Sequence, residues 1–327
     1  MSNSPYREMN TANAFQIDLF EQIYSRVEGK TKITQSLMDT LGCSRASLYR
    51  KRTGITPLTT DELIRLANTF SLSIDALRKE AETGSEVVVC TTLPPIVNYS
   101  DIDYYLNTTL NNLNALQDAE NPQLYFAAKE LPLYYYLSSP VLAGFRFYLW
   151  SIENIRQHQK FDPAAIPQEL IDKGASIAKI AENIKTTEFW LPSSLDNLIG
   201  QIQYSYTEGR VSKRVLQLLK EELMQLIDRI FARVTSEQTE NGKPYRMILC
   251  HYLTLSDGAL IDYNGNSAEV MFGYASVNYL RSRNPNLINA FKKGLRYHQI
   301  EGTPLTSLEE EKVANFRTQL EEKISSL

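Results

Sequence analysis

The sequence has few of the features that mark a membrane-spanning or disulfide-bonded protein. Its 327 residues contain no apolar run near the roughly 18 residues that a membrane-spanning helix needs. The first residues also lack the apolar stretch of a secretory signal. The three cysteines, Cys43, Cys90 and Cys250, are far apart and odd in number, which favours buried free thiols. These absences predict a soluble, cytoplasmic protein with no membrane partner.

Catalytic and metal-binding motifs are equally scarce. The three histidines, His158, His251 and His298, show neither H-x-x-x-H nor H-E-x-x-H spacing. Cys250 and His251 are neighbours, so in a strand their side chains would point to opposite faces and could not pair as nucleophile and base. No glycine-rich phosphate loop is present. We therefore expect a protein that is not an enzyme and that uses no cofactor or metal.

Positive charge is concentrated in one short segment. The net formal charge of the chain is −4, which disfavours nonspecific coating of nucleic acid. Between Lys30 and Arg65, however, seven Lys or Arg residues outnumber three acidic residues. This segment therefore carries a charge of +4 and the remainder of the chain carries −8.

The same segment has the pattern of two short helices joined by a glycine. The expected helices cover residues 33–41 and 44–53, with Gly42 in a turn that requires a positive φ. The second helix carries short or hydrogen-bonding side chains, the kind that contact base edges in the major groove. These candidates are Ser44, Arg45, Ala46, Ser47, Tyr49 and Arg50. Ser44 also suits the N-cap, which would commit its hydroxyl to the helix instead.

A second group of residues is expected to contact DNA phosphates. Their positive charge, or for Thr34 a helix N-terminal amide, would fix the register of the protein on the duplex without sensing sequence. The group consists of Lys30, Lys32, Thr34, Lys51 and Arg52. The alternative interpretation is a simple helical hairpin with no role in binding.

Further apolar periodicity predicts helices at residues 14–27, from Thr60 and from Ser73, which makes five short helices. Residues 13–78 resemble the lambda repressor-like, Cro-type (XRE) DNA-binding domain. In that family the position of Lys51 is commonly apolar, and glutamate is usual where Arg52 stands. The resemblance implies a transcription regulator that binds paired half-sites as a dimer.

We expect a helix-turn-helix domain at residues 1–82, a linker at 83–99 and a larger C-terminal domain at 100–327. Helical periodicity predicts C-terminal helices at 101–118, 122–138 with a kink at Pro132, 141–158, 167–187, 193–207, 211–235, 286–296 and 307–325. Asp257-Gly258 and Asn264-Gly265 are strong hairpin signals, so residues 245–274 are expected to form a three-stranded antiparallel meander. The predicted fold class is mainly α with this small meander.

Aromatic side chains are dense between residues 125 and 150. Packing between helices explains this density most simply, and a ligand pocket is the alternative. The pocket would be lined by Tyr125, Tyr134, Tyr135, Tyr136, Phe145, Tyr148 and Trp150.

The sequence thus predicts a sequence-specific regulator that binds double-stranded DNA as a homodimer and whose C-terminal domain dimerises or senses a signal. One alternative is a ligand-gated regulator that binds a small-molecule effector in the aromatic pocket. Another is a protein-interaction scaffold that does not bind DNA. An enzyme fused to a DNA-binding domain has the least support.

Overall fold

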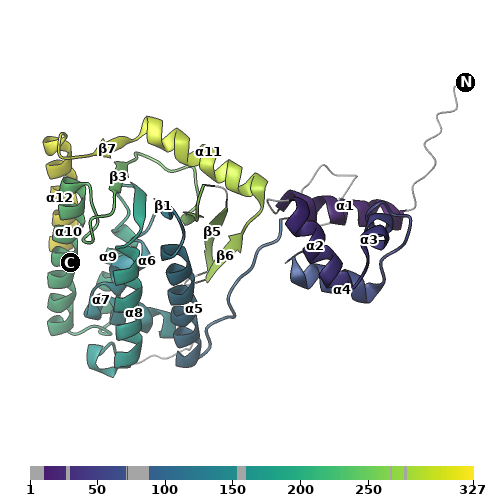
Figure 1. Ribbon diagram of the computed structural model, residues 1–327. Coiled ribbons are helices and arrows are strands. Elements are labelled where there is room, and N and C mark those ends of the chain that lie inside the picture. The colour runs from purple at the N-terminus through teal and green to yellow at the C-terminus, as the bar shows by residue number, and fades with distance from the viewer. Residues whose placement is uncertain are drawn as a thin grey trace, which may run out of the picture. The chain divides into compact units, whose positions relative to one another are not determined.

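The computed structural model describes residues 11–26, 30–70, 72, 88–152, 160–265, 267–275 and 278–327. The chain divides into two compact units, Met1–Val89 and Cys90–Leu327, each described here by itself (Figure 1). The helix expected from Ser73 lies outside the described residues, as do His158 and the first part of the expected linker.

The described part of the first unit consists of helices joined by short loops. Its helices are α1 (Thr11–Arg26), α2 (Lys30–Leu41), α3 (Arg45–Arg52) and α4 (Thr60–Thr69). Apolar side chains three or four positions apart build one core, to which α1 gives Leu19, Phe20 and Ile23. A capping box, in which Thr59 and Glu62 each bond the other's backbone amide, begins α4. The short helices are therefore held by a shared core and by their caps.

The second unit is built on a seven-stranded mixed sheet with strand order β6-β5-β4-β1-β2-β3-β7. The strands are β1 (Gln123–Ala128), β2 (Lys185–Trp190), β3 (Tyr245–Leu249), β4 (Gly258–Asp262), β5 (Ala268–Ala275), β6 (Asn278–Ser282) and β7 (Thr303–Leu305). The β1–β2 and β2–β3 pairs are parallel and the other neighbouring pairs are antiparallel. The expected mainly helical fold with a small antiparallel meander is therefore wrong.

Two central strands account for most of this error. The helix expected at 122–138 is instead β1, a loop containing Pro132, and the short helix α6 (Leu133–Leu137). The helix expected at 167–187 ends at Ala181 and is followed by β2. Both strands are largely buried on both faces, and β2 even buries Thr186, Thr187 and Glu188, so neither shows the apolar–polar alternation that identifies a half-exposed strand in sequence.

One of the two hairpin signals was also misleading. Asn264-Gly265 joins β4 to β5, as expected, with Gly265 at a φ of 84°. Asp257-Gly258 does not join neighbouring strands, because β3 pairs with β2 and β7 whereas β4 pairs with β1 and β5. Residues 250–257 therefore cross from one half of the sheet to the other.

The remaining helices of this unit occur in the expected order, but α7 ends at Trp150 rather than at residue 158, and the 3-10 helix η3 was not predicted. They are α5 (Tyr99–Gln117), α7 (Pro140–Trp150), the 3-10 helix η3 (Pro163–Ala165), α8 (Gln168–Ala181), α9 (Asp196–Thr207), α10 (Lys213–Ser236), α11 (Pro285–Glu301) and α12 (Glu310–Ser325). The connection before α5 also contacts the sheet, since Thr91 exchanges two backbone hydrogen bonds with Arg281 of β6.

Helices cover both faces of the sheet (Figure 1). Trp190 of β2 belongs to the apolar cluster that α5 to α10 and α12 share. Phe189, its neighbour in sequence, belongs to the opposite cluster with Phe291 and Leu295 of α11. This alternation is the usual geometry of a strand, here with apolar partners on both sides. In the described part of the chain, no helix is long and apolar enough to cross a membrane.

Candidate functional site

The turn between α2 and α3 has the geometry that the sequence predicted. Gly42 adopts a φ of 61°, and the amide of Cys43 donates to the carbonyl of Met38 at 3.1 Å, which closes α2. Ser44 is the N-cap of α3, and its hydroxyl accepts a hydrogen bond from the amide of Ser47 at 3.3 Å. The Ser44 hydroxyl is thus engaged in capping the helix.

One face of α3 is buried and the other is open. Leu48 and Lys51, three positions apart, are buried, and α3 contacts α1 and α2. Ser47 is half-buried. The side chains on the opposite face are exposed, and Tyr49 has 60% of its surface accessible. The open face carries Arg45, Ala46, Tyr49 and Arg50.

Lys51 was expected to contact phosphate, and the structure contradicts this. It is only 8% exposed, and its ammonium donates to Glu62 Oε2 at 2.8 Å and to the carbonyl of Pro57 at 3.4 Å. Burial would raise the pKa of Glu62, but the hydrogen bonds from Lys51 and Thr59 outweigh it and lower that pKa. The Lys51 charge is therefore neutralised inside the unit and stabilises the fold.

The other expected phosphate contacts lie around the start of α2 and the end of α3. Arg52 is exposed, and its guanidinium carbon lies 5.1 Å from the centre of the Tyr24 ring. The hydroxyl of Tyr24 is 3.3 Å from that of Thr34. Lys30 and Lys32 are in the first turn of α2, and their side chains lie outside the described part of the structure. Arg52 thus remains the described cation best placed to contact phosphate.

Gln16 supports the site and was missed by sequence reasoning. It is buried in α1, and its side chain donates to the carbonyls of Lys51 and Thr56 and accepts from the amide of Leu58. These bonds fix the loop that follows α3. The available signal was a polar residue on the apolar stripe of α1, three positions before Leu19.

The exposed arginines of α3 have no acidic partner among the described residues. Among the described residues, neither Arg45 nor Arg50 forms an ion pair, whereas Arg65 on α4 pairs with Asp61 at 3.2 Å. The exposed face of α3 therefore offers two guanidinium groups that are free to bind an external acceptor.

The aromatic cluster of the second unit forms mainly core. Tyr135, Phe145, Tyr148 and Trp150 are buried, and Phe145 packs edge-on against Phe161 at 5.4 Å. Tyr125 is half-buried and lines neither of two cavities in this unit. Tyr134 lines one cavity, and Tyr136 and Trp150 line the other. The expected seven-residue pocket therefore does not form as one site.

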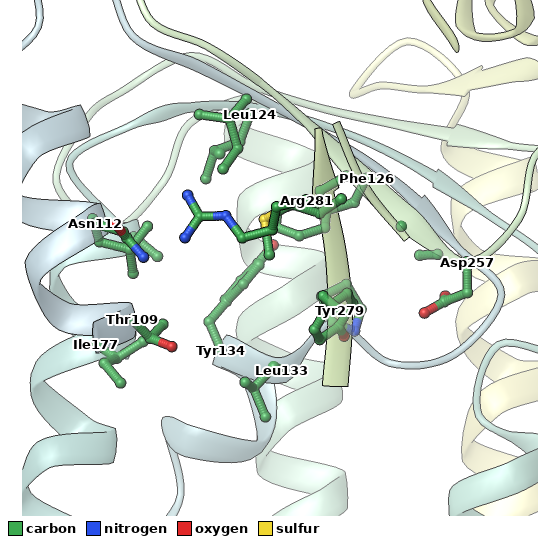
Figure 2. Close-up of a pocket in the computed structure, with 18 of the residues that line it drawn as sticks. Thr109, Asn112, Leu124, Phe126, Leu133, Tyr134, Ile177, Asp257, Tyr279 and Arg281 are labelled. Carbon is green, nitrogen blue, oxygen red and sulfur yellow. The ribbon is translucent and has the colours of Figure 1, made fainter. Parts of the chain in front are cut away.

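The first cavity is apolar and has a volume of about 150 Å³. Its wall includes Leu124 and Phe126 from β1 and Tyr134 from α6, with Arg281 reaching in from β6 (Figure 2). Both guanidinium contacts of Arg281 go to Glu269, at 3.1 and 2.7 Å, so this arginine is neutralised. The second cavity is larger, about 350 Å³, and more polar.

A fully buried carboxylate lies elsewhere in the core. Glu188 of β2 is 0% exposed and accepts hydrogen bonds from Tyr135, Trp190 and Tyr245 at 3.1, 2.6 and 2.8 Å. Burial raises the pKa of Glu188 to about 7, although the hydrogen bonds from Trp190 and Tyr245 and the charge of Arg233 lower it. Glu188 lines neither cavity. Its network therefore lies inside the fold, away from either candidate binding surface.

Two other reactive side chains of this unit, Cys250 and His298, are buried. Burial raises the pKa of the Cys250 thiol to about 11 and lowers that of His298. His298 Nε2 lies 3.1 Å from the amide of Thr254, from which it accepts a hydrogen bond. Within the described ranges, no group of three or more His, Cys, Asp or Glu side chains could hold a metal ion.

Comparison with known proteins gives little further guidance. No family model matches the chain, so the resemblance of residues 13–78 to the Cro-type domain is not confirmed, and no curated protein matches it either. Among solved structures, the chain is similar to TrmBL2, described as an archaeal chromatin protein with a novel mode of DNA binding. The identity is 12% over 91% of this chain and 95% of that chain, and the TM-score is 0.24. At that score the likeness does not establish a shared fold.

Proposed function

We propose that the protein is a DNA-binding transcription regulator whose α3 helix enters the major groove. The observation that supports this most directly is the exposed face of α3, where Arg45 and Arg50 are unpaired and flank Tyr49. An arginine can bond guanine O6 and N7 together, which distinguishes G·C from the other base pairs. The proposed activity is binding, without turnover.

The surroundings of α3 suit a rigid recognition helix. Leu48 anchors it in the core, Lys51 ties it to Glu62, and Gln16 holds the following loop. A helix fixed in this way loses little conformational freedom when it binds. We further propose that two copies bind paired half-sites, with Arg52 and the start of α2 on the phosphates.

The test is selection from random-sequence duplex DNA by the purified full chain at two salt concentrations. We expect a palindromic site to be enriched and its affinity to fall as salt rises. Arg45→Ala and Arg50→Ala should each cost about 1–3 kcal/mol at one base pair and relax the preference there.

The matched control is Arg65→Ala, which removes the same charge from α4 and should leave the sequence preference unchanged. Equal losses on every sequence in both α3 variants would contradict their assignment to base edges. Absent or salt-insensitive DNA binding would favour a protein-interaction scaffold instead.

A further inference from the structure

The larger cavity of the second unit contains an arginine that the described residues leave unneutralised. Arg146 projects from α7, and its guanidinium lies over the rings of Tyr136 and Trp150, 4.9 and 5.9 Å from their centres. Its Nε is buried without a hydrogen-bond acceptor, and no described carboxylate lies within 4.0 Å. A buried donor without a partner carries a desolvation cost that a ligand acceptor would remove.

Two carboxylates line the same cavity. Asp257 Oδ1 accepts from the amides of Lys129 and Glu130 at 3.1 and 3.3 Å. Glu130 Oε1 accepts from the side chain of Asn197 at 2.7 Å. Within the described residues, the second oxygen of each carboxylate forms no hydrogen bond. Both acids can therefore accept hydrogen bonds from a cationic group.

Another buried polar atom without a hydrogen-bond partner lies on α9. Gln201, one turn after Asn197 on the same face of the helix, has a buried Oε1 without a donor. An amide oxygen of this kind is a further acceptor for an ammonium group. The cavity therefore contains both a buried donor without an acceptor, Arg146 Nε, and a buried acceptor without a donor, Gln201 Oε1.

Arg146, Glu130 and Asp257 all line the larger cavity. Burial raises the pKa of Tyr136 to about 12; the charge of Arg146 opposes this rise, and those of Glu130 and Asp257 add to it. The same three charges act on the hydroxyl of Tyr279, and its pKa is raised chiefly by burial. The three charges therefore act on the same two hydroxyls, and both tyrosines line this cavity with them.

We propose that this cavity binds a small zwitterion of the α-amino acid class. The carboxylate of the ligand would bond Arg146, and its ammonium would bond Asp257 and Glu130. The apolar cavity shares six lining residues with this one, which are Tyr105, Glu130, Leu131, Leu133, Asp257 and Tyr279. The apolar cavity would hold the side chain of the ligand, so amino acids with apolar or aromatic side chains are favoured. The proposal concerns the second unit alone and does not depend on DNA binding.

The test is a thermal-shift and calorimetric screen of the full chain with the standard L-α-amino acids, one at a time. We expect at least one apolar or aromatic amino acid to raise the melting temperature and to bind saturably. The analogue without the carboxylate and the analogue without the amine should each bind roughly tenfold more weakly or worse, because a hydrogen-bonded charge is lost.

Variants of the two charged sides supply an independent check. Arg146→Gln and Asp257→Asn should each weaken binding roughly tenfold or more, and Arg146→Lys, which keeps the charge, less than Arg146→Gln. Arg214→Gln, an exposed change at the start of α10, is the matched control and should bind as the unmodified chain does. Circular dichroism would verify that each variant is folded.

The proposal is overturned if no amino acid shifts the melting temperature or if folded Arg146→Gln binds as tightly as the unmodified chain. Equal binding by the analogue that lacks the amine would also overturn it, because the site would then be a simple anion site. The analogue series uses the unmodified chain, so it remains decisive even if a variant fails to fold.

Discussion

At the scale of single residues, Arg50 and Lys51 are neighbours with the same charge and different environments. Lys51→Ala would leave Glu62 half-buried without its cation, so we expect the free energy of unfolding of the first unit to fall by about 1–3 kcal/mol. Since the folded-state pKa of Glu62 is lowered, this stabilisation is complete above its ordinary pKa and is lost as pH falls through the folded value. Chemical denaturation followed by far-UV circular dichroism measures both effects.

Arg50→Ala is the matched control, because Arg50 is exposed and unpaired among the described residues. It should change the free energy of unfolding by no more than about 0.5 kcal/mol and should weaken DNA binding instead. A loss of stability in Arg50→Ala as large as that in Lys51→Ala would show that this division of roles is wrong.

Glu188 gives a prediction about pH. Its pKa is about 7 in the folded state and near 4.5 when unfolded, so between these values the folded state binds more protons. Stability therefore falls as pH rises from about 4.5 to about 7, by on the order of 3 kcal/mol from this group. Glu188→Gln should abolish that fall, which urea unfolding at a series of pH values measures. Exposed Glu221→Gln should retain it, and an unchanged slope in Glu188→Gln would refute the assignment.

Residue-level roles were predictable where they depend on local pattern. Gly42 and Ser44 occupy turn and cap positions that their chemistry favours, and both do so in the structure. Lys51 was misassigned because its partner lies eleven positions away, across a loop. Arg146 was hidden within an aromatic segment, since only the folded structure shows that the described acids leave it unpaired.

At the scale of elements, two glycines allow a matched comparison. A Cβ on Gly258 would lie 2.2 Å from the carbonyl oxygen of Met271, so Gly258→Ala must push β4 away from β5. We expect the free energy of unfolding of the second unit to fall by about 3 kcal/mol, the upper end of overpacking costs. Gly200→Ala on α9 meets no atom within 4 Å and should add about 0.5–1 kcal/mol. Urea unfolding followed by tryptophan fluorescence would compare them, and equal effects would contradict the steric argument.

The elements that sequence reasoning found and missed differ in what surrounds them. Helices such as α10 and α12 have one buried and one exposed side, so their periodicity is visible in the sequence. β1 and β2 are central and covered on both faces, so periodicity alone could not separate them from a buried helix. The pairing of β4 with β1 is a long-range contact that no local signal encodes.

At the scale of the whole molecule, both tryptophans, Trp150 and Trp190, belong to the second unit. Tryptophan fluorescence should therefore follow the unfolding of that unit, whereas far-UV circular dichroism follows both units. We expect Lys51→Ala to shift part of the dichroism transition and to leave the fluorescence midpoint unchanged. Gly258→Ala should lower the fluorescence midpoint. A fluorescence midpoint that moves in Lys51→Ala would show that the two units unfold together.

The position of β1 in the sheet also affects synthesis of the chain. β1 ends at Ala128, and β4, which pairs along one of its edges, begins at Gly258. At ribosomal rates, β4 is synthesised on the order of ten seconds after β1. Meanwhile the nascent chain carries an apolar strand with unpaired backbone groups, the kind of segment that aggregates or recruits chaperones. The first unit, with all its segments local in sequence, can fold before that interval begins.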